Sequence, residues 1–384
     1  MDAETFSILK DTVQRFVEER LMPNEDRVEN EDAVPEDIIQ EMRDLGLFGM
    51  TVPEEYGGLG LTMSEEIEVL FQFGRTALAY RSVFGTTVGI GAQGIVMDGT
   101  PEQKAAWLPR IASGELIASF ALTEPGAGSD AASVQTTATR DGDLYRLNGT
   151  KRYITNAPRA GFFTVMARSE PGVAGAAGIS AFIVPADTAG ISFGKVDRKM
   201  GQKGTMTCDV IFEEVAVPAA NVIGGVPGRG FKTAMKVLDR GRIHMGALAS
   251  GQCQRLLDES VRYAVERKQF GQEIGHFQLV QAMLADSRVD AHAAWLITRD
   301  AARRFDAGEK VSADASIAKY HTTEAVGRVA DRAVQIHGGA GYMAEYKVER
   351  FYRDVRLLRI YEGTSQIQQT IIAKALLREA GLKI

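Results

Sequence analysis

The segment Leu-Tyr-Arg-Leu-Asn-Gly-Thr-Lys-Arg-Tyr-Ile-Thr, residues 144–155, marks a β domain inside a chain that is otherwise helical. Two strand-like runs, 144–147 and 151–155, flank Asn148-Gly149, and an Asn-Gly pair in this setting is a strong signal for a β-hairpin. From residue 119 to about residue 220 the chain is rich in Thr, Val, Ile, Phe and Gly. The pattern predicts a compact antiparallel β domain.

Helical periodicity is present on both sides of this domain. Before it, apolar residues recur at three- and four-residue steps from Phe6 onward. Thr100-Pro101-Glu102-Gln103 combines a cap hydroxyl, a proline at the first helical position and a glutamine that can close a capping box. After the Gly-rich linker 224–230, four long helices joined by short loops are expected, which predicts a bundle. Their ranges are about 231–268, 276–306, 311–337 and 364–380.

The predicted fold class is therefore a multidomain α+β protein. Residues 1–118 are expected to form an N-terminal helical domain, and residues 119–226 the middle antiparallel β domain. Residues 227–384 are expected to form a C-terminal four-helix bundle.

Composition excludes several classes of protein. The 384 residues carry a formal net charge of −6, so a nucleic-acid binder is not expected. Cys208 and Cys253 are far apart, and the five histidines show no ligand spacing, so neither a disulfide framework nor a metal site is expected. The longest uncharged stretch near the front, 82–97, is too short and too rich in Gly and Thr for a membrane span, and residues 1–4 do not resemble a signal peptide. We expect a cytoplasmic, bacterial protein.

Two short motifs have structural interpretations that we favour. Residues 89–94 spell Gly-x-Gly-x-x-Gly, but the neighbourhood is helical on both sides and no parallel strand follows. Close helix packing through small residues therefore fits better than a dinucleotide site. The stripe Arg350, Arg353, Arg356 and Arg359 is expected to form ion pairs with acidic residues.

Three other motifs have both a structural and a functional interpretation. The turn 123–130 could be a tight surface turn or could bring backbone N–H groups and hydroxyls close to a ligand. Asp239 and Arg242 share a helix face and could form a surface ion pair or grip a polar ligand. Residues 267–271 could simply end a helix, with Gly271 just beyond its last turn, or Arg267 could contact a phosphate.

Glu362 is the candidate with the sharpest chemical alternatives. It follows the apolar segment 357–361 and precedes a long helix. The carboxylate could sit near the N-terminus of that helix, with Thr364 as the cap. In an apolar pocket it would instead have a raised pKa and act as a general base. The residues by themselves leave both possibilities open.

Five motifs in order make nearly the whole chain resemble the acyl-CoA dehydrogenase family. They are residues 121–130, 149–156, 267–271, 335–339 and 360–368. The resemblance implies FAD bound non-covalently between the β domain and the bundle. It places Phe120, Leu122, Thr123, Ser129, Tyr153, Thr155, Thr364 and Gln366 at the flavin of their own subunit. Arg267, Gln269, Phe270, Gln278, Gln335 and Gly339 would reach the rest of FAD across a subunit interface. Ser129, Asp239, Arg242 and Gly363 would contact the acyl-CoA thioester.

The resemblance also makes Glu362 the catalytic base. In the family this residue removes a proton alpha to the thioester carbonyl, and its own backbone N–H together with a flavin hydroxyl stabilises the carbonyl oxygen. Some branches carry the base on the first bundle helix, where this chain has Gly241. The Gly-Ala-Gly of the turn lacks the asparagine of glutaryl-type members. Phe120 and Tyr153 stand where many members have Tyr and Trp.

The implied activity is dehydrogenation of a saturated acyl-CoA to trans-2-enoyl-CoA, by a member of the short-, medium- or short-branched-chain type. The resemblance further implies a homotetramer, a dimer of dimers, that passes electrons to an electron-transfer flavoprotein. Two alternatives stay open from the sequence. One is an acyl-CoA oxidase-like or nitroalkane-oxidase-like flavoenzyme that reduces oxygen. The other is a non-catalytic flavin- or CoA-binding scaffold of the same fold.

Overall fold

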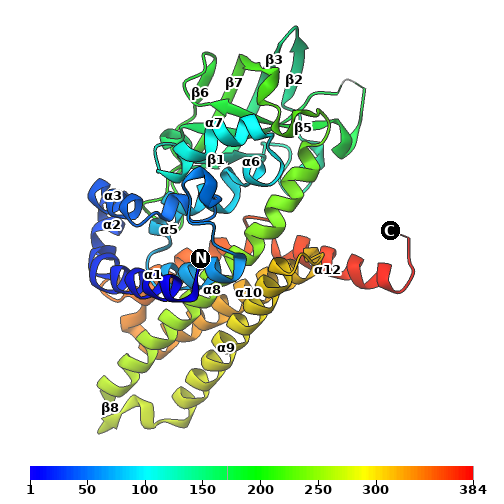
Figure 1. Cartoon of the computed structure of the whole chain (residues 1–384). Helices are drawn as coiled ribbons and strands as arrows, with labels where there is room; N and C mark the ends of the chain where they lie inside the picture. Colours follow the sequence, from blue (N-terminus) through cyan, green and yellow to red (C-terminus); the bar gives the residue numbers. More distant parts are fainter. Residues whose placement is uncertain (171, 384) are drawn as a thin grey trace.

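The computed structural model describes residues 1–170 and 172–383. Residues 171 and 384, which fall in the predicted middle and C-terminal domains, lie outside the described residues. Short helices come first, a β-sheet follows, and long helices complete the chain, so the predicted fold class is confirmed. Figure 1 shows the sheet at one end of the molecule and the long helices extending away from it.

The N-terminal region is made of short helices that pack on the later elements. The helices are α1 (Ala3–Arg15), α2 (Glu25–Glu31), α3 (Glu36–Asp44), α4 (Met63–Gly74), α5 (Leu78–Thr86), α6 (Gln93–Asp98) and α7 (Pro101–Ala112). The prediction at Thr100 is confirmed, because its side chain caps α7 and Gln103 closes the capping box. The small-residue packing predicted for 89–94 is also seen, since a Cβ at Gly91 would lie 2.7 Å from the Ala118 carbonyl oxygen.

The middle region is one seven-stranded sheet. Six of its strands lie in the order β1-β4-β2-β3-β7-β6, and the seventh, β5, pairs with β4. The strands are β1 (Ala118–Ala121), β2 (Thr137–Asp141), β3 (Leu144–Thr155), β4 (Phe162–Arg168), β5 (Ile179–Pro185), β6 (Ile191–Phe193) and β7 (Thr207–Pro218). The sequential pairs β2–β3 and β4–β5 are antiparallel, as are β3–β7 and β6–β7. Strand β4 runs parallel to β1 and β2.

The hairpin predicted at Asn148-Gly149 is wrong. Both residues lie inside the single strand β3, at a register shift against β7. A Cβ at Gly149 would lie 2.5 Å from Thr136 Oγ1, so the glycine permits close backbone approach and a bulge. The turn of the hairpin is Gly142-Asp143, between β2 and β3, where Gly142 has a φ of 58°.

Four long helices of the C-terminal region agree with the predicted ranges within a few residues. They are α8 (Gly230–Glu266), α9 (Gln278–Asp306), α10 (Ser312–His337) and α12 (Ser365–Glu379). The short helix α11 (Lys347–Val355) was not predicted and carries the start of the arginine stripe. Three of those arginines form ion pairs as expected, Arg350 with Asp26, Arg353 with Glu29 and Arg359 with Glu324.

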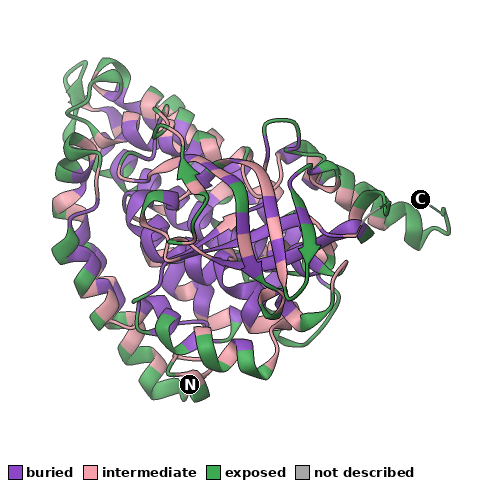
Figure 2. Ribbon diagram, turned by 90° about the horizontal axis from the view of Figure 1, so that it is seen from above, coloured by how far each residue is buried: buried purple, intermediate pink, exposed green. Residues whose placement is uncertain are grey.

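The core is continuous between the N-terminal helices and the bundle. Helix α4 packs on α8 and α9, and the largest apolar cluster joins residues of these helices. In Figure 2 the buried residues gather where the sheet crosses the long helices, whereas the C-terminal helix is largely exposed. Within residues 1–170 and 172–383, no helix has the length and apolar character needed to cross a membrane.

Candidate active site

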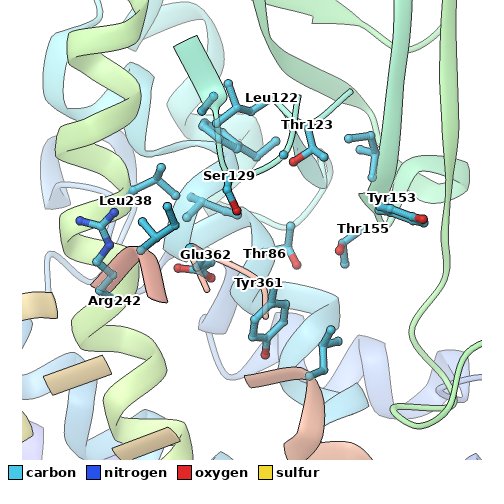
Figure 3. A pocket seen from close by; sticks show the side chains of 18 of the residues that line it. Thr86, Leu122, Thr123, Ser129, Tyr153, Thr155, Leu238, Arg242, Tyr361 and Glu362 are labelled. Atoms are coloured by element: carbon cyan, nitrogen blue, oxygen red, sulfur yellow. The ribbon is translucent and has the colours of Figure 1, made fainter. Parts of the chain in front are cut away.

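A cavity of about 390 Å³ lies where the three regions of the chain meet. Its walls come from α5 and the π-helix η5 (Thr87–Gly91), from strands β1 and β3, from α8, and from α12 with the segment before it. Figure 3 shows Glu362 between two walls, with Leu238 and Arg242 of α8 on one side and Tyr153 and Thr155 of β3 on the other. The cavity therefore joins segments from every third of the sequence.

Many of the predicted site residues share this cavity. Its lining includes Phe120, Leu122, Thr123, Ser129, Tyr153, Thr155, Arg242, Glu362 and Gly363. Tyr153 is 58 % exposed and has a φ of 58°, at a register shift of β3 against β7. An exposed aromatic face beside hydroxyl groups is suited to packing against a planar ring.

A buried ion pair holds the Gly-rich turn in place. Lys151 of β3 is fully buried, and its Nζ donates to Glu124 Oε1 at 2.7 Å and to the Leu122 carbonyl at 3.0 Å. The Glu124 carboxylate also accepts from the backbone N–H groups of Gln135 and Thr136. Burial lowers the pKa of Lys151 to about 8, although Glu124 opposes the shift. This pair fixes the turn that presents Ser129 to the cavity, and sequence reasoning missed it.

The unusual backbone conformation at Glu362 and Gly363 places the Glu362 side chain at the cavity. Glu362 has a φ of 54° and Gly363 a φ of 90°, both in the left-handed region. Lys319 Nζ donates to the Gly363 carbonyl at 2.6 Å. Gln368 Nε2 donates to the carbonyls of Glu362 and Gly363 at 3.1 and 3.0 Å. Thr364 accepts from the Ile367 N–H and caps α12, as predicted.

The Glu362 carboxylate itself has few partners. Its Oε2 is inaccessible to solvent and has no hydrogen-bond partner. Burial raises the pKa of Glu362, while the charges of Arg81, Lys319 and Arg242 oppose the shift. Of the two possibilities left open by the sequence, the structure supports the carboxylate in a desolvated pocket.

Helix α8 makes room for this carboxylate at Gly241. A Cβ on Gly241 would lie 2.4 Å from Glu362 Oε2, so any side chain at 241 would collide with it. At the next residue of the helix, Arg242 Nη1 donates to Asp239 Oδ1 at 2.6 Å. The pair is buried at Arg242, which corrects the alternative of a surface ion pair. Ser312 also donates to Asp239. Asp239 is not among the residues that line the cavity, so its contact with Arg242 positions that side chain.

A buried network of charged residues behind the cavity was also missed. Arg81 Nε donates to His244 Nε2 at 2.7 Å, and His244 Nδ1 lies 2.7 Å from Glu66 Oε1. The carboxylate of Glu66 is paired with Arg240. Arg81 alone among these four residues lines the cavity. The sequence contains no signal for this network. Its four residues lie on three helices, and each is a charged or polar residue on a buried helix face where the periodicity predicts apolar side chains.

The remaining predicted cofactor residues lie at the other end of the bundle. Arg267 follows α8, Gln269 is in β8 (Lys268–Gln269), Gln278 begins α9, and Gln335 and Gly339 lie at the end of α10 and in the next turn. None of them lines the cavity. Figure 1 places β8 at the tip farthest from the sheet. These residues therefore do not complete the cavity within one chain.

Two details in these segments differ from expectation. Gly271 is not the residue after the last turn of α8, because the helix ends at Glu266 and Arg267 is its cap. Phe270-Gly271 is instead the two-residue turn of a hairpin between β8 and β9 (Gln272–Glu273), with both residues at positive φ. Gln366 is exposed on α12 and lies outside the cavity lining.

The site and fold agree with known proteins. Family models described as the acyl-CoA dehydrogenase N-terminal, middle and C-terminal domains match residues 3–115, 119–215 and 228–377. This chain belongs to the acyl-CoA dehydrogenase family. The family consists of flavin-dependent oxidoreductases.

Relatives in the family differ in the direction and substrate that their names state. A 3-(aryl)acrylate reductase of Clostridium sporogenes is 40% identical, with 98% of this chain and 99% of the relative covered. The caffeyl-CoA reductase–Etf complex subunit CarC of Acetobacterium woodii is 41% identical, covering 92% and 93%. The human mitochondrial short-chain specific acyl-CoA dehydrogenase is 40% identical, covering 98% and 90%. The structure of butyryl-CoA dehydrogenase from Megasphaera elsdenii superposes with a TM-score of 0.94 at 35% identity, covering 98% and 100%.

FAD is the cofactor of this family, and the cavity residues fit it. A family structure from Bacillus anthracis, with a TM-score of 0.91 and 35% identity over 99% of this chain and 68% of that one, is complexed with FAD. In this member of the family the exposed Tyr153 side chain and the hydroxyls of Thr123 and Thr155 border one wall of the cavity. A Cβ at Gly126 or Gly128 would meet no atom within 4 Å, so the turn leaves its backbone open to a ligand.

Proposed function

We propose that this chain is a FAD-dependent acyl-CoA dehydrogenase that converts a saturated acyl-CoA to the trans-2-enoyl-CoA. The observation that carries the proposal is the Glu362 carboxylate, which is desolvated, unpartnered at Oε2 and directed into the cavity. A base in this state can remove a weakly acidic proton next to a carbonyl group. Bound FAD supplies the acceptor for the hydride that leaves the β carbon.

Different residues of the chain are proposed to remove the proton, bind the flavin and bind the thioester. Glu362 takes the α proton, and its backbone N–H donates to the thioester carbonyl as negative charge develops there. Thr123, Tyr153 and Thr155 would hold the flavin ring, and Ser129, Arg242 and Gly363 would bind the thioester. The apolar wall that includes Leu238 excludes water from the acyl chain. Held in this way, the α carbon of the acyl chain would lie within reach of the Glu362 carboxylate.

An anaerobic titration tests the proposal. The purified flavoprotein is mixed with a panel of saturated acyl-CoAs, and bleaching of the flavin band is followed with and without Glu362→Gln. The wild type should bleach, and the variant should retain FAD and bind acyl-CoA but bleach roughly 10²–10⁴-fold more slowly, because a positioned base is lost. Near-normal reduction in the variant contradicts the role of Glu362, and no bleaching by any thioester in the wild type contradicts the dehydrogenase.

The reverse reaction is the second candidate, favoured by the reductases among the relatives. The same geometry would let protonated Glu362 deliver a proton to the α carbon of an enoyl-CoA. Reoxidation of the dithionite-reduced protein by an enoyl-CoA panel measures this direction. Rapid reoxidation together with negligible bleaching by saturated substrates would favour the reductase.

We further propose that a homotetramer, a dimer of dimers, completes the FAD site and delivers electrons to an electron-transfer flavoprotein. The tip of the bundle exposes large apolar side chains in one chain, with Phe270 92 % exposed, Leu279 82 % and Tyr342 82 %. Arg267, Gln269, Gln278, Gln335 and Gly339 would bind the adenine and pyrophosphate half of FAD from a neighbouring subunit, and Thr364 and Gln366 would contact the flavin of their own. Arg267→Ala should lower both flavin content and tetramer stability; full flavin content in a stable tetramer contradicts the shared site.

A further inference from the structure

The turn that carries Glu362 has a backbone conformation that its neighbours must hold. Glu362 and Gly363 have φ values of 54° and 90°, in the left-handed region that residues with a side chain rarely adopt. Neither residue belongs to a helix or strand, since α12 begins at Ser365. A strained conformation of this kind persists where surrounding groups over-determine it. Some neighbouring group must therefore fix the turn.

Gln368, in the first turn of α12, makes the contacts that such a group needs. Its side chain is fully buried, and its Nε2 donates to the Glu362 carbonyl at 3.1 Å and to the Gly363 carbonyl at 3.0 Å. Among the described residues it is the sole donor to the Glu362 carbonyl, whereas the Gly363 carbonyl also accepts from Lys319. One amide group thus joins two consecutive carbonyls of the turn.

These two carbonyls also fix the orientation of the amide. A carbonyl oxygen can only accept, so the NH₂ group of Gln368 must face the turn and Oε1 must face away from it. Within residues 1–170 and 172–383, this buried Oε1 finds no hydrogen-bond partner. A buried acceptor without a partner is costly to the fold. A local rule broken in this way is typical of a residue with a task at a functional site.

The turn is packed closely from two sides. A Cβ on Gly363 would lie 2.6 Å from Gln368 Nε2, so the contact between amide and backbone depends on the glycine. On the other side, a Cβ on Gly241 of α8 would lie 2.4 Å from Glu362 Oε2. A small rotation of the turn would therefore move the carboxylate away from its place against α8.

Gln368 makes these contacts without adding a charge. A lysine or arginine in its place would favour the ionised carboxylate and lower the pKa of Glu362. The charges that oppose the raised pKa of Glu362 are those of Arg81, Lys319 and Arg242. A neutral amide can hold the turn and leave the carboxylate a strong base.

We propose that Gln368 is a positioning residue for the reaction, whose amide holds the left-handed turn so that the Glu362 carboxylate keeps its desolvated place at the cavity. Gln368 is not among the residues that line the cavity, so it acts through Glu362. The inference rests on the proposed function and adds a residue that controls the geometry of the base.

Two substitutions at adjacent glutamines test the inference. Gln368→Met keeps a similar volume but removes the donor, whereas Gln369→Met changes an exposed residue whose Nε2 donates to the Tyr320 hydroxyl. Each holoenzyme is mixed anaerobically with the saturated acyl-CoA that bleaches the wild type fastest. Gln368→Met should reduce the flavin roughly 10- to 100-fold more slowly with little change in KM, because the base is misplaced. Gln369→Met should keep the wild-type rate.

The pH profile gives a signature that a purely structural role would not produce. When the turn relaxes, the carboxylate leaves its desolvated position and the pKa of Glu362 falls towards its ordinary value. Activity is lost on the acidic side as Glu362 becomes protonated. The acidic limb of kcat/KM in Gln368→Met should therefore move to lower pH, and the limb in Gln369→Met should stay in place.

The loss should also depend on the carboxylate itself. In the Glu362→Gln protein, Gln368→Met should slow flavin reduction by at most roughly a further 3-fold, because a base that is absent cannot be misplaced. An equal loss in both backgrounds would mean that the amide supports the fold or the thioester site and does not position the carboxylate.

Thermal midpoints test the positioning without turnover. At pH 8 the ionised, desolvated Glu362 costs stability, and Glu362→Gln relieves this cost. In Gln368→Met the carboxylate has already relaxed, so Glu362→Gln should change the midpoint less than it does in the wild-type protein. The same change in both backgrounds overturns the inference.

These readouts separate the inference from the proposed function. If no thioester bleaches the wild type, the proposed function fails, and the midpoints still decide whether Gln368 holds the carboxylate. If the wild type bleaches and Gln368→Met matches Gln369→Met in rate and pH profile, the dehydrogenase survives and the inference fails. Flavin content is measured for each variant. Should Gln368→Met not fold or not retain flavin, Gln368→Asn, which keeps a neutral amide but shortens its reach, replaces it with the same expected and contradicting results.

Discussion

Glu66 and Glu362 differ in how their carboxylates are partnered. Glu66 on α4 is completely buried and fully partnered, by Arg240 on one side and His244 on the other. Glu362, before α12, is desolvated but has no partner at Oε2. Although burial opposes it, the charge of Arg240 and the hydrogen bond of His244 hold the pKa of Glu66 below its usual value, whereas burial dominates at Glu362 and raises its pKa.

The comparison separates a structural carboxylate, Glu66, from the carboxylate that we propose as the base, Glu362. A buried carboxylate that is paired stays ionised and ties helices together. A buried carboxylate left unpaired is costly to the fold and is a better base for the same reason, because its charged form is destabilised. The difference lies in the neighbours, since the side chains are identical.

The largest difference between the two glutamates should appear in the stability of their Gln variants. Glu66→Gln leaves Arg240 buried without its anion, so we expect a loss of about 3–5 kcal/mol and a large drop in thermal midpoint. Glu362→Gln should keep or raise the midpoint at pH 8. A raised folded-state pKa means that the ionised form costs stability above the ordinary pKa, and this cost disappears as the pH falls below it.

Thermal midpoints of both variants at pH 8 and near pH 5 measure this contrast. The gain in Glu362→Gln should shrink at the lower pH, while Glu66→Gln should stay the less stable protein at both. Equal destabilisation by the two substitutions at pH 8 would show that the two carboxylates have the same structural role.

A substitution at Gly241 tests whether the position of the Glu362 carboxylate matters for the reaction. Gly241→Ala places a methyl group against Glu362 Oε2 and should displace the carboxylate, with a loss in flavin reduction of about 10- to 100-fold. Gly246→Ala is the matched control on the same helix, since its Cβ would approach Thr298 outside the cavity. Equal reduction rates in the two variants would contradict the steric role of Gly241.

The charge of Lys319 should have the smallest effect. Lys319→Met removes a cation that opposes the raised pKa of Glu362, so that pKa should rise further. The acidic limb of the pH profile of kcat/KM should then move to higher pH by about one unit, with more activity lost at neutral pH than at pH 9. Lys310→Met, exposed just before the same helix, is the control. An unshifted limb in Lys319→Met would mean that Arg81 and Arg242 alone oppose the effect of burial.

Local patterns determined the elements of this protein. Helical periodicity located α8, α9, α10 and α12 within a few residues, and the residues around Thr100 identified a capping box. Glu362 was singled out by the motif 360–368, whose residues are adjacent in sequence. The structure adds the left-handed backbone of Glu362 and Gly363 and the cap at Thr364. Such features depend on residues within one or two helical turns of each other.

Long-range contacts decided the rest. Asn148-Gly149 has the composition of a hairpin turn, yet it lies within β3 because β7 pairs with β3 on both sides of Asn148. The two-residue turns are instead at Gly142-Asp143 and Phe270-Gly271. Arg81, Glu66, Arg240 and His244 come from three helices and meet only after α4 and α5 pack on α8. The sequence by itself determined the kinds of element and made Glu362 a candidate base. Only the tertiary structure decided which buried charges are paired, because pairing depends on distances between segments far apart in the chain.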